Sequence, residues 1–177
     1  PPTVPDPRDG IVRLERAGVL IALGSVLVGD GRVLTALSPL GDGNHVDARF
    51  ADNSVVPVRV GYTDRGWDLA LLVPQSGSWA KGLRPSKLDP NSTTLVSYTV
   101  GGPQRLVRAQ VLADGQKTML GADSALLPDA LVLKSRFRDA DIGGPILDQN
   151  SDVIAVLARA CVTPDKAPCT RSAYGAP

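Results

Sequence analysis

Apolar residues in this chain come in short runs rather than with the period of a helix. The runs are rich in Val, Leu and Ile and are separated by Gly, Asp, Asn and Pro, and none keeps a helical period over three turns. Val56, Val58 and Val60 alternate with their neighbours, as do Asp68, Ala70 and Leu72 in a later stretch. Each of these stretches therefore offers one face to a core. The pattern predicts an all-β fold.

Three tight turns are predicted between apolar runs. Asp30-Gly31 and Asp114-Gly115 each supply the positive φ angles that a short hairpin requires, so we expect a hairpin at both places. A third hairpin is expected at residues 148–151, between Pro145–Leu147 and residues 153–160.

Composition divides the chain into segments. Residues 1–9 hold four prolines and two aspartates and are predicted to form a linker. Residues 75–89 lack periodicity and are predicted to connect two halves, residues 10–74 and residues 90–177. Each half has enough short strands for a small closed sheet, so two β-barrels are favoured over one sandwich. No repeat relates the two halves in sequence.

Composition and charge exclude several classes of protein. With 43% hydrophobic and 21% charged residues, the chain of 177 residues is neither disordered nor fibrous. A formal charge of +1 gives no reason to expect nucleic acid as a partner. The longest uncharged apolar run, residues 17–29, is well short of the roughly 20 residues that span a bilayer. We interpret it as a buried pair of strands rather than as a signal-peptide core.

The chain has few histidine and cysteine side chains that could bind a metal ion or a cofactor. The chain has one histidine, His45, and two cysteines, Cys161 and Cys169, with no Cys-x-x-Cys spacing, so we expect no zinc site and no cofactor. The cysteine spacing suits a disulfide that closes a short loop in an oxidising compartment, and two free buried thiols are the alternative.

Three segments in order resemble the active-site segments of trypsin-like serine proteases, in particular those of the bacterial Deg/HtrA branch. Residues 24–28 and 32–39 (GSVLV, then RVLTALSP) are similar to the family's strands before its general-base histidine. Residues 67–72 (WDLALL) resemble the strand that holds the orienting aspartate. Residues 141–148 (DIGGPILD) resemble the nucleophile turn and the strand after it. The resemblance implies a chymotrypsin-type fold of two six-stranded antiparallel β-barrels.

The same resemblance implies that two catalytic groups are absent. The general-base position falls on Ser38, the orienting carboxylate on Asp68 and the nucleophile on Ile142. Isoleucine offers no nucleophilic atom, and a serine hydroxyl is a poor base at neutral pH, so acyl transfer by this route is not expected. His45 lies outside the general-base position, and we interpret it as a solvated loop residue.

Other positions of the former site are also implied by the resemblance. The oxyanion-hole amides would belong to Ala140 and Ile142, and alanine at a position where the family has glycine makes a preserved hole less favourable. Arg136 falls at the base of the specificity pocket, either favouring an acidic group or simply solvated. For Asp68 we expect a hydrogen bond from the Ser38 hydroxyl, the alternative being bonds from backbone amides or water.

The function that the resemblance implies is that of an inert pseudoprotease. We expect it to bind a protein or peptide partner, by strand addition at the former cleft, as part of a larger, membrane-anchored or secreted extracytoplasmic protein. We expect no membrane insertion by this segment. The alternatives are a hydrolase with unorthodox residues and a purely structural spacer.

Overall fold

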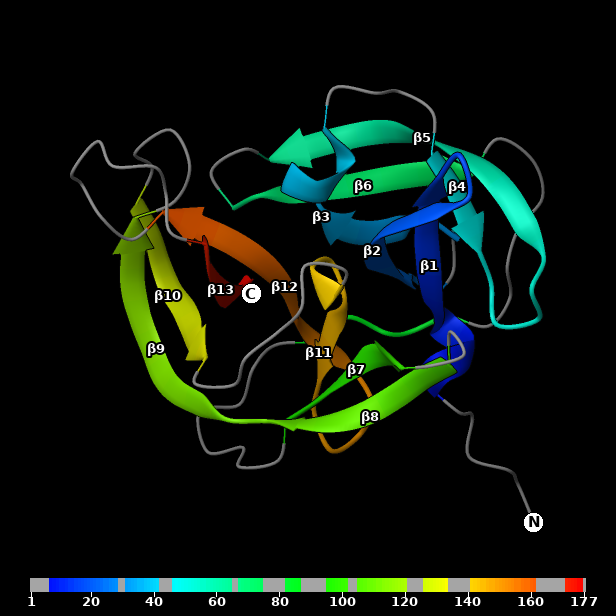
Figure 1. The fold of residues 1–177 in the computed structure, drawn as a ribbon. Helices are drawn as coiled ribbons and strands as arrows, with labels where there is room; N and C mark the ends of the chain where they lie inside the picture. The colour runs from blue at the N-terminus through cyan, green and yellow to red at the C-terminus, as the bar shows by residue number, and fades with distance from the viewer. Residues whose placement is uncertain are drawn as a thin grey trace, which may run out of the picture.

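The fold is seen in a computed structural model of the chain, and its regular structure is almost entirely strand (Figure 1). Two short 3-10 helices accompany the strands, η1 (Pro7–Gly10) and η2 (Ser38–Leu40). The prediction of an all-β fold is confirmed. No helix among the described residues is long and apolar enough to cross a membrane. The structure describes residues 7–28, 31–41, 46–64, 67–74, 82–86, 95–101, 105–120, 126–133, 141–161 and 171–176.

The first half of the chain forms a closed barrel of antiparallel strands in the order β1-β2-β3-β6-β5-β4. Its interior is filled by aliphatic residues and one aromatic, among them Leu14, Leu40, Phe50 and Leu72. The predicted alternation holds, because Val58, Ala70 and Leu72 face this core. The six strands are β1 (Ile11–Arg16), β2 (Val19–Val26), β3 (Val33–Ala36), β4 (Val46–Arg49), β5 (Val55–Asp64) and β6 (Leu69–Pro74).

Two turns join the first three strands. Ala17 and Gly18 have φ angles of 53° and 78° and connect β1 to β2 by a two-residue turn, with Arg16 opposite Val19. The apolar run 17–29 therefore holds this turn and one strand, β2, so its interpretation as a pair of strands was wrong. Gly31 has a φ of 72°, and β2 pairs antiparallel with β3, which confirms the hairpin predicted there.

The second half of the chain forms a seven-stranded sheet in the order β8-β7-β11-β12-β13-β10-β9. Its two outer strands, β8 and β9, are successive parts of the chain with only Leu112 between them, and Figure 1 shows them as one long curved ribbon. Counted as one strand, they close a six-stranded barrel with the same strand order as the first. The strands are β7 (Leu95–Gly101), β8 (Arg105–Val111), β9 (Ala113–Leu120), β10 (Leu126–Leu133), β11 (Pro145–Leu147), β12 (Val153–Cys161) and β13 (Arg171–Ala176).

This arrangement confirms the chymotrypsin-type double barrel and corrects one hairpin. Asp114-Gly115 lies inside β9, and β8 pairs with β7 while β9 pairs with β10, so no hairpin forms there. The long strand is shared between two neighbours, and those long-range pairings override the local turn preference of Asp-Gly. The hairpin at residues 148–151 is confirmed, since β11 pairs with β12 and the Asp148 carboxylate accepts the backbone N–H groups of Asn150 and Asp152.

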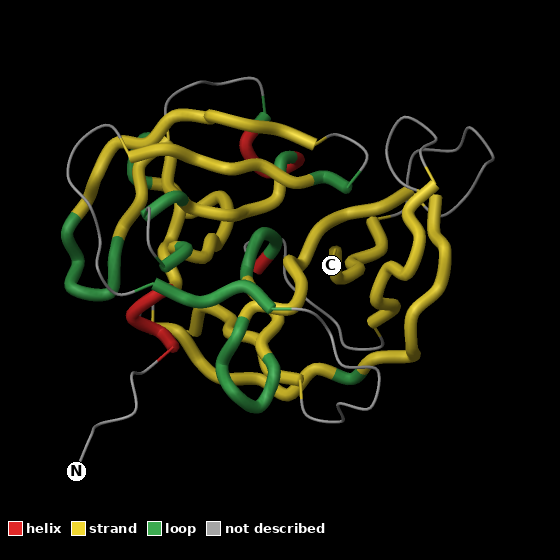
Figure 2. Tube along the Cα trace, turned by 180° about the vertical axis from the view of Figure 1, so that it is seen from behind, coloured by secondary structure: helices red, strands yellow, loops and turns green. Residues whose placement is uncertain are grey.

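The two barrels are joined by a shared apolar cluster and by part of the predicted connector. Ile11 of β1 and Leu83 pack with Tyr98, Leu147 and Val153 of the second barrel. The described connector residues, 82–86, form one bridge to the first barrel at Leu27 and one to the second at Val153. Figure 2 shows this segment from behind, running between the barrels. Residues 75–81, 87–90 and 1–6 lie outside the described residues, so only part of the predicted connector and linker is seen.

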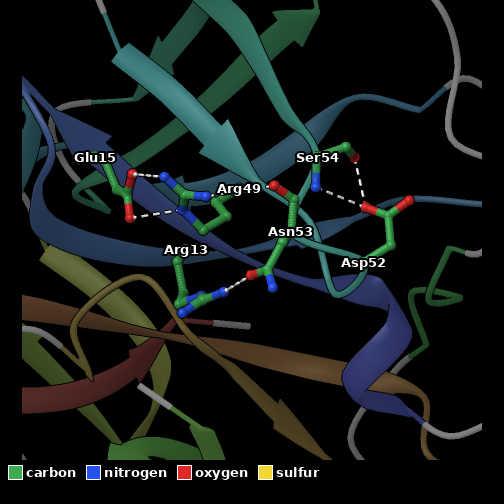
Figure 3. Close-up of polar contacts among 6 residues, drawn as sticks. All are labelled: Arg13, Glu15, Arg49, Asp52, Asn53 and Ser54. Atoms are coloured by element: carbon green, nitrogen blue, oxygen red, sulfur yellow. Dashed lines mark hydrogen bonds and ion pairs between the residues drawn. The ribbon is translucent and has the colours of Figure 1, made fainter. Parts of the chain in front are cut away.

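An ion pair between the partly exposed Arg49 and the buried Glu15 joins β4 to β1 in the first barrel (Figure 3). The Arg49 guanidinium donates two hydrogen bonds of 3.1 Å to the Glu15 carboxylate, which is only 5% exposed. The hydrogen bonds to Glu15, and to a smaller extent the negative charge of Glu15, raise the pKa of Arg49 above its usual value. Arg13 donates to the Asn53 side chain at 3.0 Å, which ties the β4–β5 turn to the same strand.

Candidate functional site

The Ser38 and Asp68 side chains, predicted to be partners, are joined by a hydrogen bond. The Ser38 hydroxyl donates to one carboxylate oxygen of Asp68 at 2.8 Å, and the Ser38 backbone N–H donates to the other at 2.7 Å. The predicted hydroxyl–carboxylate bond is therefore confirmed. The alternative of a backbone partner holds as well, because each oxygen of the carboxylate accepts a different group of the same residue.

Strand register brings these two residues together. Ala36, the last residue of β3, lies opposite Leu69, the first residue of β6. The next residue on β3's side, Leu37, donates its N–H to the Asp68 carbonyl at 2.9 Å. Asp68 has a φ of 57°, a conformation that costs energy in a residue other than glycine. That backbone conformation turns the chain into β6, and the three hydrogen bonds to Leu37 and Ser38 hold it there.

Burial explains why Asp68 needs these donors. Asp68 is only 6% exposed, whereas Ser38 is exposed at the surface. A buried carboxylate without donors is costly, and charge-assisted hydrogen bonds offset that cost. Ser38 thus supplies a hydroxyl donor to the carboxylate from the exposed side, and the pair forms the first-barrel half of the candidate site.

The second half of the candidate site is the turn formed by residues 141–144. Ile142 is 4% exposed, and its carbonyl accepts the backbone N–H of Leu23 in β2 at 3.1 Å. The turn is also bonded to β12, because the Gly143 N–H donates to the Leu157 carbonyl at 2.7 Å and the Leu157 N–H to the Gly144 carbonyl at 2.9 Å. The Ile142 side chain is thus buried in a turn whose backbone is hydrogen-bonded to both barrels.

Gly143 brings this turn into direct contact with the first barrel. It has a φ of 94°, and a Cβ atom added there would overlap the Leu23 carbonyl oxygen and the Thr35 hydroxyl. The same Cβ would come within 3.2 Å of the Ala36 backbone nitrogen, two residues before Ser38. Glycine is therefore needed both for the conformation and for the close approach. The Ile142 turn and the Ser38–Asp68 pair meet at the end of β3.

Asp141 anchors the turn on its other side. Asp141 is 4% exposed, and its carboxylate accepts a hydrogen bond of 2.7 Å from the Thr99 hydroxyl in β7. This contact belongs to the second barrel alone. The turn is consequently held by both barrels, with the aspartate fixed to β7 and the glycine docked on β2 and β3.

Several predicted site residues lie outside the described part of the chain. These are His45, Arg136, Ala140 and Cys169, and of Cys161 only the backbone is described, as the last residue of β12. The oxyanion-hole remnant, the former specificity pocket and the disulfide therefore stay predictions. Among the residues that the structure describes, no group of three or more His, Cys, Asp or Glu side chains is placed to hold a metal ion.

Comparison with known families identifies the chain. Residues 22–156, more than half of the sequence, match the trypsin-like peptidase domain. The chain belongs to this family. The matched segment includes Ser38, Asp68 and Ile142, so both halves of the candidate site lie within the trypsin-like domain. No curated protein sequence matches the chain.

Solved structures support the same fold assignment. The protease domain of MamO from Magnetospirillum magneticum, in its apo form, is 19% identical with a TM-score of 0.75, covering 99% of this chain and 93% of that one. The protease Rv3671c in an inactive form is 18% identical with a TM-score of 0.71, covering 96% and 83%. A serine-to-alanine variant of Rv3671c from M. tuberculosis H37Rv, also in an inactive form, is 18% identical with a TM-score of 0.69, covering 99% and 90%. At these identities the likeness establishes a shared fold.

Two structural features of the site were not predicted from the sequence. One is that Ser38 supplies both donors, so the predicted hydroxyl bond and the alternative backbone bond occur together, and the other is the Thr99–Asp141 hydrogen bond. The Gly-Gly pair at Gly143 and Gly144 was a visible signal of a tight turn. The partner of Asp141, by contrast, lies 42 positions away in the sequence and has no local signature.

Proposed function

We propose that this trypsin-like domain is a catalytically inert pseudoprotease that binds an extended segment of another protein in the former substrate cleft. On the family's pattern the general-base position is Ser38 and the nucleophile position is Ile142. The observation that carries the proposal is the closed Ser38–Asp68 pair, in which the carboxylate that would orient an imidazole is already bonded by a hydroxyl and an amide.

The chemistry of these residues supports inactivity. Acyl transfer on this fold needs a hydroxyl nucleophile, an imidazole that takes its proton and a carboxylate that orients the imidazole. Ile142 offers no nucleophilic atom, and its side chain is buried at 4% exposure. The Ser38 hydroxyl donates to Asp68, and a serine hydroxyl is too weak a base at neutral pH to take a proton from a nucleophile. A preserved carboxylate alone does not restore the reaction.

The strand pairing of β12 supports binding. β11 pairs with β12 only as far as Val156, and Leu157 is bonded to the Gly143–Gly144 turn. From Ala158 to Cys161, β13 is the only described strand that pairs with β12. The other edge therefore offers backbone donors and acceptors to an added strand. Because β12 also packs beside β3, this edge lies near the barrel junction where Ser38 and Ile142 are held.

The proposal extends to the setting of the domain. The spacing of Cys161 and Cys169 supports a disulfide and with it an extracytoplasmic location. We propose further that the domain is part of a larger or membrane-anchored protein. A peptide map without reductant tests the disulfide. A fragment pair that shifts in mass on reduction supports it, and two alkylatable thiols in the folded, unreduced protein contradict it.

Binding to fluorescein-labelled β-casein, an unfolded protein, tests the cleft. We expect saturable binding by fluorescence anisotropy and no casein fragments on a gel. Ser38→Trp places a large ring at an exposed position of the site. We expect casein binding to weaken about tenfold, because the ring blocks contacts between the cleft and the bound strand.

The matched control is Ser38→Ala, which removes the hydroxyl without adding bulk and should bind casein like the unmodified chain. Cleavage of casein would overturn inactivity. No binding, or equal binding by the tryptophan variant, would overturn the cleft as the binding site and favour a structural spacer.

A further inference from the structure

We propose that the outer edge of β8 is a docking site for an acidic, extended segment of a partner protein, which would add to the second barrel as a further strand. This site is separate from the β12 edge, and the inference does not depend on the proposed function of the cleft.

The pairing of β8 leaves one of its edges open. All seven residues of β8 pair with β7, from Arg105 opposite Gly101 to Val111 opposite Leu95. β8 is also the first strand in the order of its sheet, and within the described residues no strand pairs with its other edge. Such an edge presents unpaired N–H and C=O groups, which are a template for an incoming strand.

Arg8 shows which backbone groups point outward. Its guanidinium donates to the Leu106 carbonyl at 3.3 Å and lies 5.8 Å from the centre of the Tyr98 ring. The Leu106 carbonyl is therefore accessible from outside the β7–β8 pair. Backbone groups alternate between the two edges of a strand, so the outward set continues at Arg108 and Gln110. Arg8 occupies one end of the edge, and among the described residues no strand covers the stretch beyond it.

The side chains of β8 define the chemistry of the partner. Arg105 and Arg108 belong to this strand, and residues 105–112 contain no acidic residue. Arg108 is exposed, and so are Val107 at 47% and Leu112 at 56%. Neighbouring residues in a strand point to opposite faces, so Arg108 and Val107 lie on different faces of the sheet. A complementary strand carries acidic residues on one face and apolar residues on the other.

Charge also decides between an acidic partner and a second copy of this chain. Antiparallel pairing of two β8 edges centred on Arg108 would place this residue opposite Arg108 of the other copy, and like charges across a strand pair are destabilising. An acidic strand instead gains attraction from Arg108 and the same backbone hydrogen bonds. The edge therefore favours a foreign acidic strand over self-association.

The test uses fluorescein-labelled octapeptides in an anisotropy titration of the chain. An octapeptide of alternating valine and glutamate should bind saturably, and the matching valine and lysine peptide should bind about tenfold more weakly. Methylating the backbone nitrogens of every second residue of the glutamate peptide removes donors on one edge. At least one of the two alternately methylated peptides should lose binding, since one set faces β8.

A pair of protein variants separates local from overall charge. Arg108→Glu should weaken binding of the glutamate peptide about tenfold and improve binding of the lysine peptide. Arg59→Glu, at an exposed position of β5 in the first barrel, makes the same change in net charge and should leave both affinities unchanged.

Amide NMR shifts locate the bound peptide. Peptide-induced shifts at the Arg108 and Gln110 N–H groups support the proposal. Shifts confined to β12, equal loss of binding in both arginine variants, or no saturable binding would each overturn it. Shifts confined to β12 would overturn it without contradicting a binding role for the cleft.

Discussion

The two halves of the candidate site differ in the kind of side chain that they hold. In the first barrel a polar pair is kept, and both oxygens of Asp68 are bonded by Ser38. In the second barrel the position is aliphatic, and Ile142 is buried. The backbone at Ile142 still makes its inter-barrel hydrogen bond to Leu23. One half holds a hydrogen-bonded polar pair, and the other buries an aliphatic side chain.

The difference follows from what each position must satisfy. A buried carboxylate that is kept requires donors, so a replacement beside Asp68 has to offer them. The aliphatic side chain of Ile142 has no polar group to satisfy and gains free energy from burial. The fold therefore constrains the side chain at Asp68 more strongly than the side chain at Ile142.

The largest expected effect is at the turn that holds the aliphatic half. Gly143→Ala would force a Cβ into the Leu23 carbonyl and the Thr35 hydroxyl at a φ of 94°. We expect a loss of about 4 kcal/mol in the free energy of unfolding, measured by urea denaturation.

The control for this prediction is Gly18→Ala. Gly18 has a similar φ of 78° and nothing within 4 Å of an added Cβ, so about 1 kcal/mol should be lost. Equal losses for the two variants would show that backbone conformation, and not contact between the barrels, determines the result.

The polar half is tested next by removing each partner. Asp68→Ala leaves the Ser38 hydroxyl and N–H without their acceptor and frees the turn into β6, and we expect a loss of about 3 kcal/mol. Ser38→Ala keeps the N–H donor to the carboxylate and should cost about 1 kcal/mol. Urea denaturation measures both, and an equal cost would contradict the greater constraint assigned to the carboxylate.

A smaller effect is expected from trimming the aliphatic half. Ile142→Val removes one buried methylene group, and we expect a loss of about 1 kcal/mol by the same measurement. No loss would mean that the Ile142 side chain contributes little packing, and the gain assigned to its burial would be contradicted.

The smallest effect concerns a polar group that neither half of the site uses. Ser25 in β2 is fully buried, and its hydroxyl is the one buried side-chain polar atom without a hydrogen-bond partner among the described residues. Ser25→Ala removes that group and should leave the free energy of unfolding unchanged or raise it by up to about 1 kcal/mol. A clear destabilisation in thermal or urea melts would indicate that the hydroxyl is satisfied in solution.

Local patterns predicted the fold where local chemistry decides it. The alternation of Ala70 and Leu72 and the turn at Gly31 gave correct strands and a correct hairpin, because each depends on neighbouring residues. The hairpin predicted at Asp114-Gly115 does not form, because β8 and β9 pair with different strands and these pairings keep the segment extended. The identical strand order of the two barrels was not visible in the sequence, since topology can be shared without any repeat of residues.

The site was predictable where one buried polar group requires a hydrogen-bond partner from a nearby residue. A buried Asp68 beside Ser38 requires a donor, and that reasoning led to the observed hydrogen bond. The Thr99–Asp141 and Arg49–Glu15 contacts join strands far apart in sequence, and only the assembled fold brings them together. The close approach of Gly143 to β2 and β3 likewise depends on how the barrels dock.

Labelling with a fluorophosphonate probe, which reacts with activated serine nucleophiles, tests the central claim of inactivity most directly. The unmodified chain should remain unlabelled under conditions that fully label trypsin, because Ile142 has no nucleophilic atom and Ser38 donates to Asp68. The double variant Ser38→His with Ile142→Ser should gain labelling at the new serine. Covalent labelling of the unmodified chain, located by mass spectrometry, would contradict the account.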